Sequence, residues 1–127
     1  MIFFDHIEIH VRNSIKYVSF LELLFKGGRY KRISNNNTYM FLTNDNLRFE
    51  IKESLNYKSN IDLVESIGFC LPCLRMKNCI RHLENLENIV FMKKIDNPDG
   101  SCIFFKDYEG IDWHFKDYDV LDLFTNI

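Results

Sequence analysis

Alternating ionisable residues near the start of the chain are the first group whose types and spacing can do chemistry. His6, Glu8 and His10 occur at every second position of the stretch from Phe3 to Val11, with apolar residues between them. This alternation is typical of a half-buried strand, because successive side chains point to opposite faces of a sheet. Imidazole and carboxylate groups on one face can transfer protons or bind a metal ion. The simpler alternative is that these are polar residues on the solvent-exposed face of a sheet, without a chemical role.

A Cys-x-x-Cys pair, Cys70 and Cys73, is the second candidate for chemistry. It falls inside the stretch from Gly68 to Leu74, which is predicted to be a strand, where residues three apart point to opposite faces. This placement argues against a zinc knuckle or a redox pair. Together with Cys79 and Cys102, these residues are expected to be reduced thiols that pack in the core.

Length and composition limit the classes of protein. The chain has 127 residues, of which 46% are hydrophobic and 15% aromatic, as suits one domain with a packed core. The net charge of -2 and the lack of a long basic run argue against a nucleic-acid partner. The start of the chain lacks the features of a secretory signal, and no apolar run is long enough to span a bilayer. We therefore expect a cytoplasmic domain that acts on a small molecule, without a nucleic-acid or membrane partner.

The predicted elements that position these residues follow a recognisable order. After the first strand, Asn13 or Ser14 can cap a helix that Gly27-Gly28 ends. The apolar face of this helix consists of Tyr17, Val18, Leu21, Leu24 and Phe25. Three short strands follow, around residues 30–33, 39–43 and 47–52.

The same order returns in the second half of the chain. A strand over residues 68–74 is followed by a helix whose apolar face consists of Met76, Cys79, Ile80, Leu83 and Leu86. Three strands are then predicted near residues 89–94, 102–106 and 111–116, with a turn at 97–100. Superposing the halves pairs His6 with Phe69, a shift of 63, and Glu50 with His114, a shift of 64. The chain is therefore predicted to be an internal duplication, with modules of about 3–53 and 67–118.

Two stretches carry a resemblance to a known family. Phe4 to Asn13, followed by an amphipathic helix, resembles the opening of glyoxalase I and bleomycin-resistance proteins. Asn97-Pro98-Asp99-Gly100, with the later stretch from Tyr108 to Phe115, also resembles these proteins. The resemblance covers the chain from Phe3 to about Tyr118 and implies the vicinal oxygen chelate superfamily. Its fold is α+β, with two tandem βαβββ modules that form a curved mixed sheet around a cavity, here as a single domain of residues 1–127.

The resemblance also implies a metal site. Metal-dependent members supply ligands from the first and last strands of each module, and those positions here hold His6, Glu50, Phe69 and His114. His6, Glu50 and His114 would bind one divalent ion, whether Zn, Ni, Mn, Co or Fe. Such an ion acts as a Lewis acid while a carboxylate, Glu50 or Glu8, removes a proton from the substrate. Two of these positions differ from the common pattern of the family. Many members have His where this chain has Phe69, and Glu where it has His114.

Three functions remain open. The first is a glyoxalase-like, metal-dependent lyase or isomerase acting on a small oxygenated molecule. The second is a metal-free binding protein of the bleomycin-resistance type, in which Phe69 offers a stacking surface. The third is an Fe(II) dioxygenase.

Further residues are expected around the ligand and at the surface. Arg48, Lys52, Asp112 and Lys116 share strand parity with Glu50 or His114. The residues expected to bind the substrate are Phe69, His10, Arg48 and Asp112. The apolar tail from Tyr118 to Ile127 is expected to cover a sheet edge or to join a homodimer interface.

Overall fold

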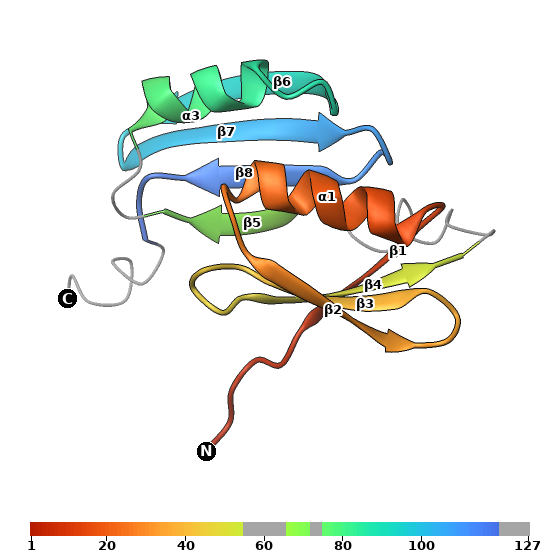
Figure 1. Ribbon diagram of the computed structural model, residues 1–127. Helices are drawn as coiled ribbons and strands as arrows, with labels where there is room; N and C mark the ends of the chain where they lie inside the picture. The colour runs from red at the N-terminus through yellow and green to blue at the C-terminus, as the bar shows by residue number, and fades with distance from the viewer. Residues whose placement is uncertain (55–65, 72–74, 120–127) are drawn as a thin grey trace. The chain divides into compact units, whose positions relative to one another are not determined.

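Two compact units with the same order of elements make up the chain. The computed structural model describes residues 1–54, 66–71 and 75–119 (Figure 1). The units are Met1–Leu63 and Val64–Ile127, and the described part of each contains a four-stranded mixed sheet and one helix. The predicted α+β class and the two βαβββ modules are confirmed. The enclosed cavity and the single domain stay predictions.

The first sheet places the amino-terminal strand beside the last strand of its unit. Its elements are β1 (Ile7–Val11), α1 (Ser14–Leu24), β2 (Arg29–Ser34), β3 (Thr38–Leu42) and β4 (Arg48–Glu53). The strand order is β1-β4-β3-β2, with β1 parallel to β4 and the other pairs antiparallel. Parallel neighbours cannot be joined by a tight hairpin, and here α1 and the β2–β3 hairpin form the connection. As a result, residues about forty positions apart lie side by side.

The helix α1 begins and ends where its flanking residues predict. The Asn13 side chain caps it by accepting a hydrogen bond from the backbone nitrogen of Lys16 at 3.1 Å. The chain leaves the helix through Gly27 and Gly28, whose φ angles of 135° and 110° suit glycine. The helix contacts β1, β3 and β4. The buried core of this unit includes Tyr17, Val18, Leu21, Leu24, Ile9, Val11, Phe41, Phe49 and Ile51.

The burial of Ile9 and Val11 under α1 confirms the alternation predicted for β1. Their relative exposures are 2% and 0%. Since neighbouring strand residues point to opposite faces, the ionisable residues of β1 lie on the face that α1 does not cover.

The second sheet repeats this topology. Its elements are β5 (Ile67–Cys70), α3 (Met76–Glu84), β6 (Ile89–Asn97), β7 (Gly100–Asp107) and β8 (Asp112–Lys116). The strand order is β5-β8-β7-β6, with β5 parallel to β8, and α3 lies along β6 and β7 (Figure 1). The strand predicted over residues 68–74 is described only as far as Cys70, and residues 72–74 lie outside the described part. Leu86 lies past the end of the helix that was predicted to include it.

A buried carboxylate fixes the hairpin between β7 and β8. Asp107 accepts hydrogen bonds from the backbone nitrogens of Glu109 at 2.8 Å and Ile111 at 3.1 Å. It also accepts one from the indole nitrogen of Trp113 at 3.0 Å. The indole is fully buried. Because Trp113 is held on the core face, the next residue, His114, points to the opposite face of the sheet.

Other expectations concern thiols, membranes and assembly. Cys79 and Cys102 are buried, as expected of core residues, whereas Cys70 is only half-buried. Cys73 and residues 120–127 of the apolar tail lie outside the described part of the chain. None of the described helices is long and apolar enough to cross a membrane. The homodimer stays a prediction.

The packing of α1 predicts a contrast between two neighbouring leucines. Leu21 is fully buried and Leu23 is 54% exposed. We expect Leu21→Ala to lower the free energy of unfolding by about 2–5 kcal/mol, because it leaves a cavity in the core. Leu23→Ala should change it by less than about 0.5 kcal/mol. Urea unfolding followed by circular dichroism measures both, and equal losses would contradict this packing.

Candidate functional site

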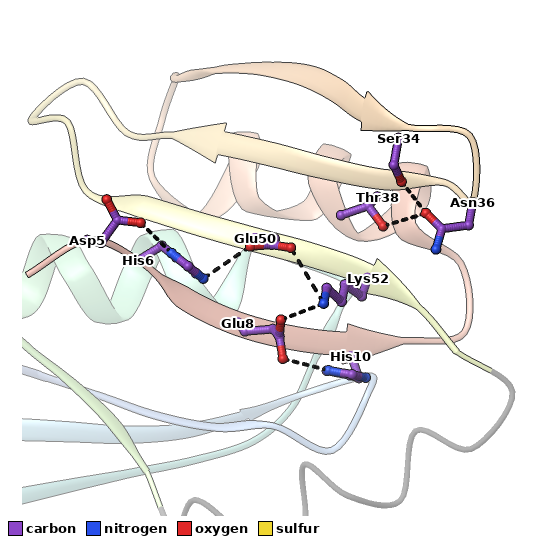
Figure 2. Close-up of polar contacts among 9 residues, drawn as sticks. All are labelled: Asp5, His6, Glu8, His10, Ser34, Asn36, Thr38, Glu50 and Lys52. Atoms are coloured by element: carbon purple, nitrogen blue, oxygen red, sulfur yellow. Dashed lines mark hydrogen bonds and ion pairs between the residues drawn. The ribbon is translucent and has the colours of Figure 1, made fainter.

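A row of ionisable side chains lies on the face of the first sheet that α1 does not cover (Figure 2). Glu8 and His10 come from β1, His6 directly precedes that strand, and Glu50 and Lys52 come from β4. Strand pairing places Glu8 directly opposite Glu50. Like charges directly opposite one another destabilise a sheet, so these two carboxylates need cationic or hydrogen-donating neighbours.

Nitrogen atoms supply that compensation. His6 Nε2 lies 3.1 Å from Glu50 Oε2, and His10 Nε2 lies 3.0 Å from Glu8 Oε2. Lys52 Nζ lies 2.8 Å from Glu8 Oε1 and 3.7 Å from Glu50 Oε1. Each oxygen of the two carboxylates therefore has a nitrogen partner. The salt bridge with Lys52 and the hydrogen bond with His10 lower the pKa of Glu8, which keeps it ionised at neutral pH.

Asp5 orients the His6 ring, a role that strand alternation gives no reason to expect. His6 Nδ1 lies 2.6 Å from Asp5 Oδ2, and this hydrogen bond, reinforced by the charge of Glu50, raises the pKa of His6. The same hydrogen bond lowers the pKa of Asp5. Arg48, predicted to bind substrate, has its Nη1 atom 3.7 Å from Asp5 Oδ1. Asp5 precedes β1, where the chain is not yet extended in the sheet, so it can turn back to its neighbour.

Three of these side chains fit a metal ion. One ligand atom each from His6, Glu8 and Glu50 lies within 4.8 Å of the others. Ligand atoms held at about 2.1 Å from one ion are at most about 4.2 Å apart, so small side-chain rotations suffice to bring them together. Asp5 holds Nδ1 of His6, which leaves Nε2 for an ion, as is usual for metal-binding histidines.

His114 occupies a different environment in the second unit. Its Nδ1 atom lies 2.5 Å from Ser66 Oγ. Its ring lies across Gly68, where a Cβ atom would clash with the imidazole. The centroids of the His114 and Phe104 rings are 5.1 Å apart. Burial, followed by the charge of Lys116, lowers the pKa of His114, so the imidazole is neutral at neutral pH.

The strand register corrects the superposition of the two halves. Glu8 lies opposite Glu50 in the first unit, and Gly68 lies opposite His114 in the second. The first strands are therefore offset by 60 residues and the last strands by 64. The residue that matches His6 is Ser66, and the contact of Ser66 with His114 matches that of His6 with Glu50.

Phe69, which the sequence superposition paired with His6, lies on the other face of its sheet. Its ring lies 6.1 Å from that of Trp113 and 6.3 Å from that of Phe115, both buried. A shift of three residues, like any odd shift, turns a strand side chain to the opposite face. Asp112 lies in β8, with Oδ1 3.3 Å from Lys106 Nζ. The roles of Phe69, His10, Arg48 and Asp112 in substrate binding stay predictions.

Comparisons with known proteins bear on the fold. By sequence, the chain matches no protein-family model and no curated protein. By structure, it is similar to the fosfomycin resistance protein FosX from Listeria monocytogenes, crystallised with Mn(II) and sulfate. The identity is 20%, the coverage 98% of each chain and the TM-score 0.74. A variant of that protein, complexed with Mn(II) and 1S,2S-dihydroxypropylphosphonic acid, matches at 18% identity over 95% of this chain and 94% of that one, with a TM-score of 0.72.

A third solved structure broadens the group. A glyoxylase/bleomycin resistance protein/dioxygenase domain from Frankia sp. EAN1pec matches at 12% identity over 94% of this chain and 99% of that one, with a TM-score of 0.74. The chain has the vicinal oxygen chelate fold. This fold supports unrelated activities, so the chemistry must be argued from the residues. In this fold, the ionisable row at the β1–β4 pair contains imidazole and carboxylate groups, whose types can bind a metal ion or accept a proton.

The two histidines should titrate on opposite sides of the usual imidazole pKa. NMR titration should find the pKa of His6 raised and that of His114 lowered. Because the pKa of His6 is higher in the folded state, its pairing stabilises the fold below the unfolded pKa. This contribution disappears as the pH rises through the raised value.

Asp5→Asn tests the cause of the His6 shift. Loss of the carboxylate should move the pKa of His6 down, whereas Asp99→Asn, in the turn between β6 and β7, should leave it unchanged. An unchanged His6 titration in the Asp5 variant would show that Asp5 does not control this ring.

Proposed function

We propose that the protein is a divalent-metal-dependent enzyme of the glyoxalase type, with lyase, isomerase or related chemistry on a small oxygenated molecule. The observation that carries the proposal is the convergence of His6, Glu8 and Glu50, with ligand atoms within 4.8 Å. Imidazole and carboxylate ligands suit Zn, Ni, Mn, Co and Fe(II). The fold adds support, since FosX from Listeria monocytogenes was crystallised with Mn(II).

The site gives its residues distinct roles. His6 binds the ion through Nε2, because Asp5 holds Nδ1. Glu50 is the second ligand, since its side chain is only 16% exposed and already contacts His6. Glu8, with a side chain 42% exposed and directly opposite Glu50 in the strand register, is the proton acceptor. A bound divalent ion would supply Lewis acidity toward a substrate oxygen.

Small molecules with neighbouring oxygen atoms are the proposed substrate class. The Listeria protein was crystallised with a dihydroxypropylphosphonic acid, which has two such oxygens. A substrate screen therefore begins with fosfomycin and with α-hydroxycarbonyl compounds, each with and without added metal. Turnover that requires both the metal and Glu8 would support the assignment of the proton acceptor.

Phe69 supports the metal-free alternative less than its sequence position suggests. That alternative depends on an aromatic ring in place of a metal ligand, but Phe69 packs against Trp113 and Phe115. The residue that matches His6 in the second unit is Ser66, whose hydroxyl offers no stacking surface. The packing of Phe69 therefore favours the metal-dependent function.

Metal binding should depend on Glu50. Isothermal titration of chelator-treated wild-type protein with Mn(II) should give one site. Glu50→Gln should weaken binding at least about tenfold, because it removes an anionic ligand. Glu84→Gln on the exposed side of α3 serves as the control and should match the wild type. Failure of the wild type to bind Mn(II), Zn, Ni, Co or Fe(II) would contradict the proposed function.

His114 is proposed as a further ligand, and two substitutions separate its possible roles. His114→Ala should lower Mn(II) affinity, whereas His114→Glu should preserve it, because a carboxylate coordinates the same class of ions. Elemental analysis of both variants checks the difference. If both substitutions leave metal content unchanged, His114 is not a ligand, and the site consists of residues of the first unit.

A further inference from the structure

Lys52 has an unusual position within the ionisable row. It lies two residues after Glu50 on the same face of β4, with His10 as its partner in the strand register. Its side chain nevertheless reaches back toward the preceding pair of carboxylates, 2.8 Å from Glu8 Oε1 and 3.7 Å from Glu50 Oε1 (Figure 2). One ammonium group therefore bridges two carboxylates on neighbouring strands.

This bridge places a positive charge beside the carboxylates to which a metal ion would bind. The carboxylates of Glu8 and Glu50 are register partners, and they repel each other unless a cation lies nearby. The remaining oxygen of each is taken by a histidine ring, His10 for Glu8 and His6 for Glu50. A divalent ion on His6 and Glu50, with the charge of Glu8 beside it, must therefore compete with the ammonium for this negative charge.

We propose that Lys52 is the internal counter-ion of this site and that a divalent ion binds by displacing its ammonium group. Lys52 thereby sets the metal affinity without being a ligand. This inference rests on the metal-dependent function proposed above. The Lys52 side chain is 40% exposed, so the ammonium can move into solvent on its flexible four-carbon stem without breaking a packed core.

Displacing the Lys52 ammonium costs free energy, and a variant without this charge avoids that cost. The ion must replace the attraction between Lys52 and two carboxylates, and it meets the repulsion of the ammonium until that group has moved away. Methionine has a similar length and no charge. Lys52→Met should therefore leave the negative charge of Glu8 and Glu50 without its lysine counter-ion and tighten Mn(II) binding at least about tenfold.

Titration of the full chain with Mn(II) tests the proposal, with two matched variants. Lys52→Arg keeps the positive charge and should bind Mn(II) like the wild type. Lys94→Met removes a charge of similar exposure that belongs to the second unit and pairs there with Asp96 at 3.3 Å, and it should also match the wild type. Thermal unfolding gives a second readout. Metal-free Lys52→Met should melt below the wild type, and Mn(II) should raise its melting temperature more than that of the wild type.

The outcomes separate this inference from the function on which it rests. Tighter binding by Lys52→Met alone supports the displaced counter-ion, and loss of the gain in a Lys52→Met, Glu50→Gln double variant locates it at this site. If the wild type binds Mn(II) and Lys52→Met binds equally or more weakly, the inference is overturned and the metal-dependent function stands. If neither protein binds Mn(II), Zn, Ni, Co or Fe(II), both are overturned.

Discussion

The parallel pairing of β1 with β4 is the constraint on which the candidate site depends. It brings Glu8 opposite Glu50, and the sheet can hold these two charges only because four nitrogen contacts compensate them. The apolar residues that alternate with the site residues pack under α1, which fixes the register. Slippage by one residue would turn the carboxylates toward the core. The same hydrophobic burial that stabilises the unit therefore holds the site together.

The two units use one topology for different electrostatic environments. Across the first sheet, the row that contains the site runs Glu8, Glu50 and Met40, while the matching row of the second runs Gly68, His114 and Phe104. Charge accumulates in the first row and is compensated by Lys52 and two histidines. In the second row, burial favours a neutral ring, and Ser66 contacts its Nδ1 atom. The two units therefore share strand positions and hold different side chains at them.

Local patterns in the sequence predict most of the fold and part of the site. The Asn13 cap and the alternation in β1 act over a few residues, so they can be recognised without a structure. The superposition of the two halves matches His6 with Phe69, three residues from the observed match, Ser66. The register of β5 depends on its long-range pairing with β8, which local patterns do not reveal. Asp5 and Ser66 were missed for a related reason, since neither lies in a strand of regular alternation. Lys52 was recognised by strand parity, but its diagonal contact with two carboxylates depends on side-chain packing.

A crystal structure of the protein grown with Mn(II) tests the central claim most directly. Anomalous scattering at the manganese edge should reveal one ion about 2.2 Å from His6 Nε2 and from a carboxylate oxygen of Glu50, within the range of such ligands. The ammonium of Lys52 should have moved away from Glu8 and Glu50. A structure with no anomalous peak on this face of the first sheet, and with Lys52 still bridging the carboxylates, would contradict the account.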